Sequence, residues 1–275
     1  MKTILVPLSG QPHDRRAATA AFLAAARFGA YVEGLCVIPP VEIRTSVENA
    51  AIPAALAEQL VRIGRADQAA ALDGAHHVFD AVRDRFAVSA AWRPVTGLLP
   101  DVIAEEGRLA DLVVMAQPAD GSGALAPAIE AALFASGRPL LLAPGTEPVT
   151  LGDTVAVAWD GGPAAARAVA LALPLLRRAG RVVILAAENP APGRAADPAR
   201  LSANLARHGV SVITHPLTLA GRSISRALLD AARDEGADVM VMGAYGHSRV
   251  REMVWGGVTR DILREPPPLA VLLAH

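Results

Sequence analysis

One apolar run near the end of the chain reads ADVMVM (residues 237–242) and passes directly into GAYG (residues 243–246). A short valine- and methionine-rich run that ends at glycine predicts a buried strand. Nine residues then separate Gly246 from Gly256, and VTRDIL (residues 258–263) predicts a helix. Glycines between a strand and a helix let the backbone approach an anion, and the helix N-terminus offers unpaired N–H groups. The segment therefore predicts a phosphate-binding turn.

The same order of elements occurs twice along the chain. ADLVVM (residues 110–115) resembles the run at 237–242, and TILV (residues 3–6) resembles TVAV (residues 154–157). Each copy alternates strands and helices, which predicts a parallel sheet with right-handed crossovers. PGTEP (residues 144–148) has the composition of a linker. We therefore expect an α/β protein of two tandem doubly wound, five-stranded domains, over residues 1–147 and 151–275.

The two copies differ in the length of one connection. Residues 47–86 carry apolar side chains at near-helical intervals, and the second copy has no connection of that length at this place. This predicts an additional helix or helical arm in the first domain, which Gly64 or Gly74 divides into two. The final strands, at 140–143 and 269–273, are apolar and are expected at sheet edges, where an exposed strand needs a covering partner.

Composition excludes several classes of function. Of 275 residues, 52% are hydrophobic and 19% are charged, and the net charge is −1. No strong field therefore favours nucleic acid or an anionic membrane as a partner, and the single Cys36 excludes an internal disulfide. No run approaches the roughly 20 apolar residues that span a bilayer, and the first apolar run is too short for a signal peptide. We expect a cytoplasmic protein.

Gly243, Gly246 and Gly256 form a Gly-x2-Gly-x9-Gly motif, and Asp160 closes the first strand of the same copy. With the repeat and the order of strands, these residues resemble the universal stress protein family. The resemblance covers nearly the whole chain, as a tandem pair of domains. It implies the Rossmann-like fold of the adenine-nucleotide α-hydrolases, with the final strands pairing the two domains as a pseudo-dimer. It also implies an ATP site in the second domain, with or without Mg²⁺.

The resemblance implies particular residues for this site. Asp160 would accept hydrogen bonds from the adenosine, and glycine N–H groups would bind the phosphates. The implied residues are Ala158, Asp160, Ala187, Met242, Gly243, Gly246, His247, Gly256, Gly257, Val258 and Thr259. The family has serine or threonine where Gly257 stands here, so a hydroxyl donor is lost, and Thr259 is the nearest replacement. One lost neutral hydrogen bond is worth roughly 0.5–1.5 kcal/mol, or about tenfold in affinity.

The first copy departs further from the family pattern. Ser9 stands where the family has aspartate, and the stretch after Met115, which includes Pro118 and Asp120, contains no Gly-x2-Gly. Proline removes an N–H donor, and a carboxylate repels phosphate. We read the first domain as one that keeps the fold and lacks the nucleotide site.

The expected function is that of an ATP-binding sensor or regulator of the stress response. No P-loop, Ser/His/Asp set, carboxylate pair or metal-ligand spacing is visible, so we expect slow or no hydrolysis and assign no catalytic or metal residue. One alternative is a nucleotide-free universal stress protein that acts by binding an unknown protein partner. Another alternative is an adenine-nucleotide-dependent enzyme. For Asp160 itself, the alternative to a nucleotide ligand is a helix N-cap. Self-association through edge strands is a further expectation.

Overall fold

The computed structural model describes residues 1–40, 54–120, 123–187, 197–245 and 257–275. The first half contains β1 (Thr3–Leu8), α1 (Asp14–Phe28), β2 (Tyr31–Ile38), α3 (Ala54–Arg83), β3 (Ala90–Thr96), α4 (Leu99–Gly107), β4 (Leu112–Met115), α5 (Ala126–Phe134) and β5 (Leu140–Leu142). The second half contains β6 (Thr154–Trp159), α6 (Pro163–Leu176), β7 (Arg181–Ala187), α7 (Pro198–Arg207), β8 (Val212–Leu217), α8 (Ile224–Asp234), β9 (Val239–Gly243), α9 (Gly257–Ile262) and β10 (Ala270–Ala274).

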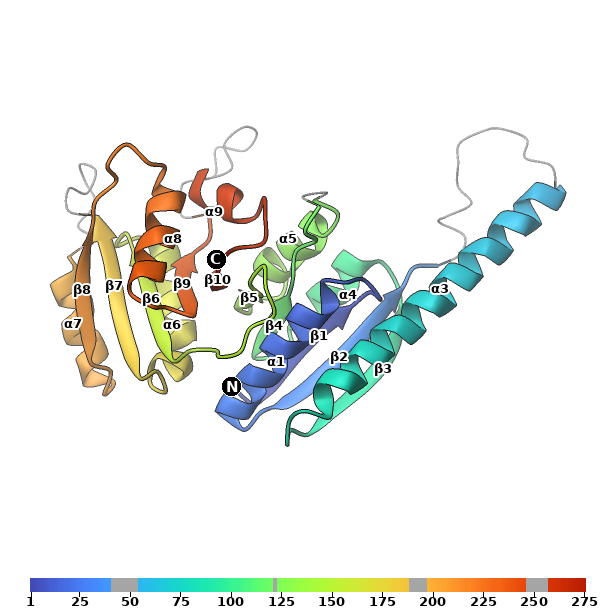
Figure 1. Cartoon of the computed structure of the whole chain (residues 1–275), viewed down its shortest axis with the longest axis horizontal. Coiled ribbons are helices and arrows are strands. Elements are labelled where there is room, and N and C mark those ends of the chain that lie inside the picture. The colour runs from blue at the N-terminus through green and yellow to red at the C-terminus, as the bar shows by residue number, and fades with distance from the viewer. Residues whose placement is uncertain (41–53, 121–122, 188–196, 246–256) are drawn as a thin grey trace.

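All ten strands form one sheet, in the order β3-β2-β1-β4-β5-β10-β9-β6-β7-β8. Every neighbouring pair within a half is parallel, which confirms the prediction of two doubly wound α/β units. The halves meet where β5 pairs antiparallel with β10, with Leu141 opposite Leu272. The two apolar strands that were expected at sheet edges therefore cover each other at the centre of the sheet, as in a dimer of two such domains (Figure 1).

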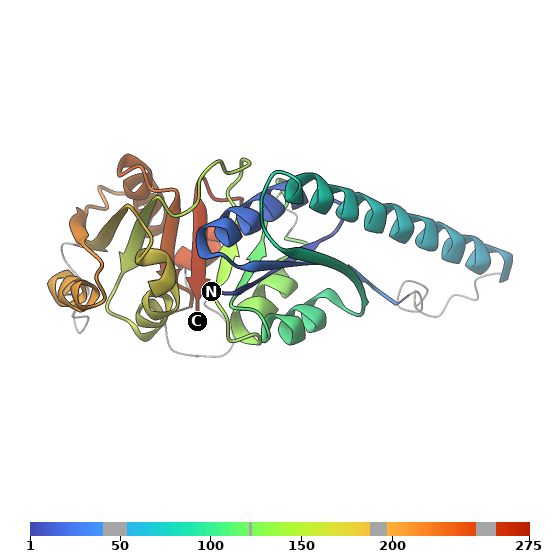
Figure 2. The same ribbon diagram turned by 90° about the horizontal axis from the view of Figure 1, so that it is seen from below.

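Helices cover both faces of this sheet (Figure 2). One apolar layer contains residues of α1, α3, α6 and α7, and the other contains residues of α4, α5, α8 and α9. Because the central strands are buried on both faces, they are nearly continuous hydrophobic runs, such as Leu-Val-Val-Met in β4. None of the helices in the described ranges is long and apolar enough to cross a bilayer.

The predicted helical insert is the single helix α3, which spans 30 residues. The expectation that Gly64 or Gly74 divides it was wrong. A glycine inside a helix costs only about 1 kcal/mol, which is too little to break a helix whose residues Ala75, Phe79 and Val82 are buried against the first half. The C-terminal part of α3 is buried against the first half, whereas its N-terminal part projects away from the body of the molecule (Figure 1). Leu60 and Ile63 on that projecting part are 45% and 49% exposed.

Candidate functional site

A crevice is expected between β6 and β9, at the carboxyl ends of the strands. The chain leaves β6 through α6 to reach β7, and it leaves β9 toward α9 and β10, on the opposite side in the sheet order. Ligands of open α/β sheets bind at such points, where the strand order reverses. Strands β6 and β9 are direct neighbours, with Val157 opposite Val241. The ends of these two strands, at Asp160 and Gly243, therefore flank the crevice.

Asp160 lies at the surface directly after β6. Its Oδ1 accepts a hydrogen bond from the backbone N–H of Gly162 at 2.8 Å, which closes a short turn before α6. Gly161 has φ 74°, a left-handed conformation that glycine adopts without strain. Pro163 then occupies the first turn of the helix, where a missing N–H costs nothing. The helix-cap interpretation of Asp160 therefore accounts for one of its bonds, and the residue remains exposed.

Gly243, the last residue of β9, lies directly against the first turn of α6. A Cβ built on Gly243 would lie 2.4 Å from the backbone N of Ala165 and 2.6 Å from the backbone C of Ala164. Only glycine allows the strand and the helix to approach this closely. Gly243 thus brings the end of β9 beside the N-terminus of α6 and the Asp160 turn.

The residues that follow β9 are fixed from two sides. The N–H of Tyr245, which has φ 55°, donates to Thr259 Oγ1 at 3.3 Å. Thr259 is buried in α9, so its hydroxyl helps to hold the turn, and its contact with a nucleotide remains a prediction. The ring of Tyr245 lies 5.0 Å from the ring of Phe134 in α5. Burial, with a contribution from the nearby charge of Glu130, raises the pKa of Tyr245 to about 12.

Gly257 is the exposed first residue of α9. An added Cβ would meet no atom of the described chain within 4 Å, so no contact in that part of the chain demands glycine here. The next residue, Val258, is half-buried. The predicted ligands Gly246, His247 and Gly256 lie outside the described residues.

The remaining predicted residues lie on neighbouring strands. Ala158 is half-buried near the end of β6, opposite Leu185 of β7. Met242 is buried in the same apolar layer against which Ala158 packs. Ala187 is exposed at the end of β7. The structure therefore brings Ala158, Asp160, Ala187, Met242 and Gly243 to the carboxyl edge of three adjacent strands, and their roles remain predictions.

The first half keeps the corresponding turn and fills it with its own carboxylate. Gly10 follows β1 with φ 78°, as Gly161 follows β6. Asp14 Oδ2 accepts hydrogen bonds from the N–H groups of Ser9 (2.7 Å), Gly10 (2.6 Å) and Gln11 (3.2 Å). Asp14 is 1% exposed, and burial raises its pKa while these N–H donors oppose the rise. An anion that belongs to the chain therefore occupies this turn, an arrangement that the sequence reading missed.

Helix α3 closes the same turn from above. A Cβ on Gly10 would lie 2.5 Å from the carbonyl oxygen of Ala71 in this helix. The counterpart of α3 in the second half, α7, has only ten residues. The two corresponding turns therefore differ in both the carboxylate and the covering helix.

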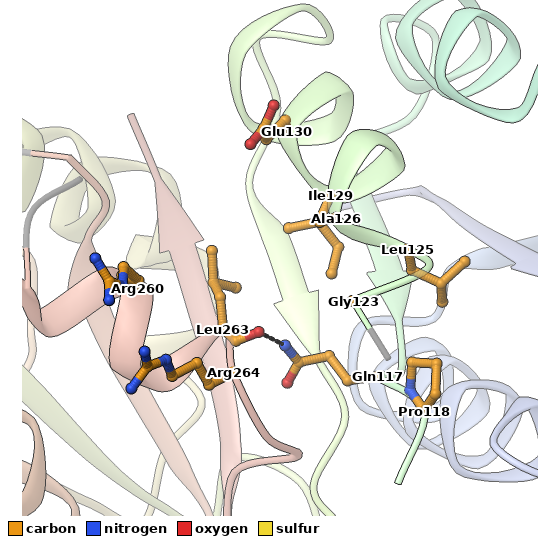
Figure 3. A pocket seen from close by; sticks show the side chains of 10 residues that line it. All are labelled: Gln117, Pro118, Gly123, Leu125, Ala126, Ile129, Glu130, Arg260, Leu263 and Arg264. Atoms are coloured by element: carbon orange, nitrogen blue, oxygen red, sulfur yellow. Dashed lines mark hydrogen bonds between the residues drawn. The ribbon is translucent and has the colours of Figure 1, made fainter. Parts of the chain in front are cut away.

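The described residues form several hollows, and one of them is lined by Gly161 of the Asp160 turn. A cavity of about 120 Å³ lies where α5 meets α9, between the two halves, and Gln117 Nε2 donates to the carbonyl of Leu263 at its edge (Figure 3). A more open groove of about 720 Å³ runs between α6 and α7, beside Trp159. None of the predicted nucleotide residues lines either hollow. Among the described residues, no group of three or more His, Cys, Asp or Glu side chains is placed to hold a metal ion.

Comparisons with known proteins place this geometry in context. The model of the universal stress protein family matches residues 153–272. Among solved structures, a universal stress protein from Archaeoglobus fulgidus matches 99% of this chain and 97% of its own, with 17% identity and a TM-score of 0.69. A universal stress protein in complex with cAMP matches 53% of this chain and 98% of its own, with 23% identity and a TM-score of 0.37.

A third universal stress protein, from Lactobacillus plantarum, matches 52% of this chain and 97% of its own, with 19% identity and a TM-score of 0.40. Comparison with curated proteins finds no match. The Archaeoglobus structure establishes similarity of fold along the whole chain, and the family model establishes similarity of sequence for the second half.

Proposed function

Because the model of the universal stress protein family matches residues 153–272, we propose that this half binds ATP, with or without Mg²⁺, at the crevice between β6 and β9. The chain then acts as a nucleotide-dependent sensor or regulator in the stress response. Asp160 accepts hydrogen bonds from the adenosine, and the backbone N–H groups of the segment from Gly243 to Gly257 bind the phosphates.

The observation that carries this proposal is the approach of Gly243 to Ala165. It brings the N-terminus of α6, the carboxylate of Asp160 and the end of β9 to one point of the sheet edge. The crevice lies where the strand order reverses, which is where ligands of such sheets bind. Glycine at a strand end also permits close approach of a phosphate to the backbone.

The first half takes no nucleotide in this proposal. Its corresponding turn is occupied by Asp14 and lies under α3. A phosphate there would have to displace a buried carboxylate and then meet its charge. One nucleotide per chain is therefore expected, and a stoichiometry of two would contradict this assignment.

Binding regulates the protein through the free energy that it adds to the ordered state. A ligand that binds only the folded state adds about 2.7 kcal/mol of stability at a concentration 100 times its Kd. A bound nucleotide also shifts the population of any partner-binding conformation, by the difference in its affinity for the two states. The carboxylate of Asp160 already caps a turn, so we propose slow or no hydrolysis.

The test is to release bound nucleotide by denaturing the purified protein and to identify it by mass spectrometry. Calorimetric titration of nucleotide-free protein with ATP should then give a single site and a rise in Tm. Asp160→Ala should weaken ATP binding, whereas the matched change Asp153→Ala, at the other end of β6, should leave it unchanged. If no adenine nucleotide co-purifies, binds or raises Tm, the proposal fails. Rapid ADP release would instead indicate an enzyme.

A second candidate function, binding of a protein partner, is favoured by the projecting part of α3. A short helical segment without packing partners is marginally stable in water, so a partner that packs against this part would stabilise it. Its residues Leu60 and Ile63 are about half exposed. The double change Leu60→Glu and Ile63→Glu should abolish association with a partner or a second copy and leave ATP binding unchanged. Sedimentation of the unchanged protein and of the double variant, together with a titration of each with ATP, would separate the two candidate functions.

A further inference from the structure

The repeat gives each residue of the first turns of α1 a counterpart in α6. The interval that separates the starts of β1 and β6 also separates Gly29 from Gly180, the glycines that precede β2 and β7. The spacing is therefore unbroken from the first strand of each half to the end of the helix that follows. The same interval pairs Arg16 with Arg167.

In the first half, Arg16 is used inside the structure. Its guanidinium donates from Nη1 to the carbonyl of Pro144 at 2.8 Å and from Nη2 to the carbonyl of Gln117 at 2.6 Å. The side chain is almost fully buried, and burial lowers its pKa. Because Gln117 and Pro144 each lie two residues beyond a strand, β4 and β5, the guanidinium lies over the carboxyl edge of the sheet. An arginine at this position of the helix therefore reaches that edge.

In the second half, another side chain takes the place of this guanidinium. The strand registers make Ala244 the counterpart of Gln117 and His275 the counterpart of Pro144. The ring nitrogen Nδ1 of His275 lies 3.1 Å from the carbonyl oxygen of Ala244, at hydrogen-bond distance. Arg167 is exposed, and it forms no ion pair or hydrogen bond with the part of the chain that the structure describes. Arg16 of α1 uses its charge inside the structure, whereas the charge of Arg167 on α6 is available to a ligand.

We propose that Arg167 binds the phosphate groups of the nucleotide and makes the site selective for adenine nucleotides over adenosine. This inference rests on the proposed function of the crevice between β6 and β9. A guanidinium presents several N–H donors in a planar fork that matches phosphate oxygens, and such charge-assisted bonds are stronger than neutral ones. Arg167 also supplies a positive charge at a site where Asp160 is negative. The backbone N–H groups hold the phosphate, and Arg167 adds discrimination by charge.

The experiment compares ATP and adenosine binding by calorimetry in the unchanged protein and three variants. Arg167→Gln should weaken ATP binding about tenfold or more, with adenosine affinity unchanged. The ATP affinity of Arg167→Lys should lie between those of the unchanged protein and Arg167→Gln, because lysine keeps the positive charge and lacks the planar fork of N–H donors. The matched control is Arg177→Gln, which removes an exposed arginine at the other end of the same helix and should leave both affinities unchanged.

The outcomes separate this inference from the proposed function. If the unchanged protein binds ATP and Arg167→Gln weakens ATP and adenosine binding equally, or neither, the role of Arg167 is overturned and the nucleotide site stands. If Arg177→Gln produces the same loss as Arg167→Gln, general charge and not position determines the affinity, and the inference also fails. If the unchanged protein binds neither ligand, the proposed function fails and the inference falls with it.

Discussion

A Cβ atom on Gly243 would lie 2.4 Å from the backbone nitrogen of Ala165. This glycine is therefore required by the packing of β9 against α6, before any ligand is considered. The same close approach forms one wall of the crevice in which we propose that ATP binds. One residue thus couples the stability of the second half to the geometry of its site.

Gly243→Ala should destabilise the protein and weaken ATP binding together. The added methyl group must displace backbone atoms of Ala164 and Ala165 and not merely a flexible side chain, and overpacking of this kind costs about 1–3 kcal/mol. Chemical denaturation measures the first effect and calorimetry the second. The matched control is Gly257→Ala, for which the described chain has no atom within 4 Å of the new Cβ. Equal losses of stability in the two variants would contradict the packing argument.

Gly257→Ser should strengthen ATP binding about tenfold, since it restores one hydroxyl donor, worth roughly 0.5–1.5 kcal/mol. The open space around an added Cβ at Gly257 means that the change brings no clash with the described residues. Comparison with Gly257→Ala isolates the hydroxyl from the loss of backbone freedom. Calorimetric Kd values for the three proteins test this. An affinity for Gly257→Ser no higher than that for Gly257→Ala would show that the hydroxyl does not reach the phosphate.

Much of the fold was predictable from local sequence. The valine-, leucine- and methionine-rich runs of β4 and β9 are strands buried on both faces, and Gly29 caps α1 as expected, whereas the C-cap of α6 is Arg177, before the expected cap Gly180. The repeat of these runs predicted two similar halves, and the apolar character of β5 and β10 predicted that these strands need covering. Such signals are local or periodic, so one sequence suffices to read them.

Other features depend on contacts between distant residues, and these were not predictable. Gly64 or Gly74 was expected to interrupt α3, but the burial of Ala75, Phe79 and Val82 against residues far away in sequence stabilises the helix by more than one glycine costs it. The carboxylate of the first half stands at Asp14, the first residue of α1, and not at the position of Ser9, where the family motif has it. The requirement for Gly243 was read as a feature of phosphate binding, although its neighbour Ala165 also demands it.

Asp14→Ala should destabilise the first half strongly, whereas Asp14→Asn should be close to neutral. Alanine leaves the partly buried N–H groups of Ser9 and Gly10 without their acceptor, at up to about 1–3 kcal/mol for each unsatisfied group, whereas the N–H of the exposed Gln11 can bond to water. Asparagine retains a carbonyl oxygen for these donors and removes the buried charge. Unfolding by denaturant at neutral pH measures both variants. A large loss in Asp14→Asn would show that the charge itself is needed.

The two forms of this side chain should also differ in pH dependence. Burial raises the folded-state pKa of Asp14 above 3.8, so folding favours its protonated form. Its contribution to stability is therefore fully present below 3.8 and is lost as pH rises through the folded-state pKa. Asparagine cannot titrate, so the free energy of unfolding of Asp14→Asn should rise relative to that of the unchanged protein as pH increases through this range. A constant difference across the range would contradict the raised pKa.

Gly34→Ala should loosen α3 from the first half. An added Cβ would lie 2.5 Å from a ring carbon of Phe79 and 2.9 Å from a ring carbon of Trp92, because β2 and α3 approach closely at this point. The displaced ring should cost about 1–3 kcal/mol, and Phe79→Ala alone should cost about 3–5 kcal/mol through the cavity that it leaves. In the double variant the new methyl group enters space that the ring has vacated. The combined loss should therefore be smaller than the sum of the two single losses by more than about 0.5 kcal/mol. Additive losses, measured by chemical denaturation in a double-mutant cycle, would show that Gly34 and Phe79 do not share this space.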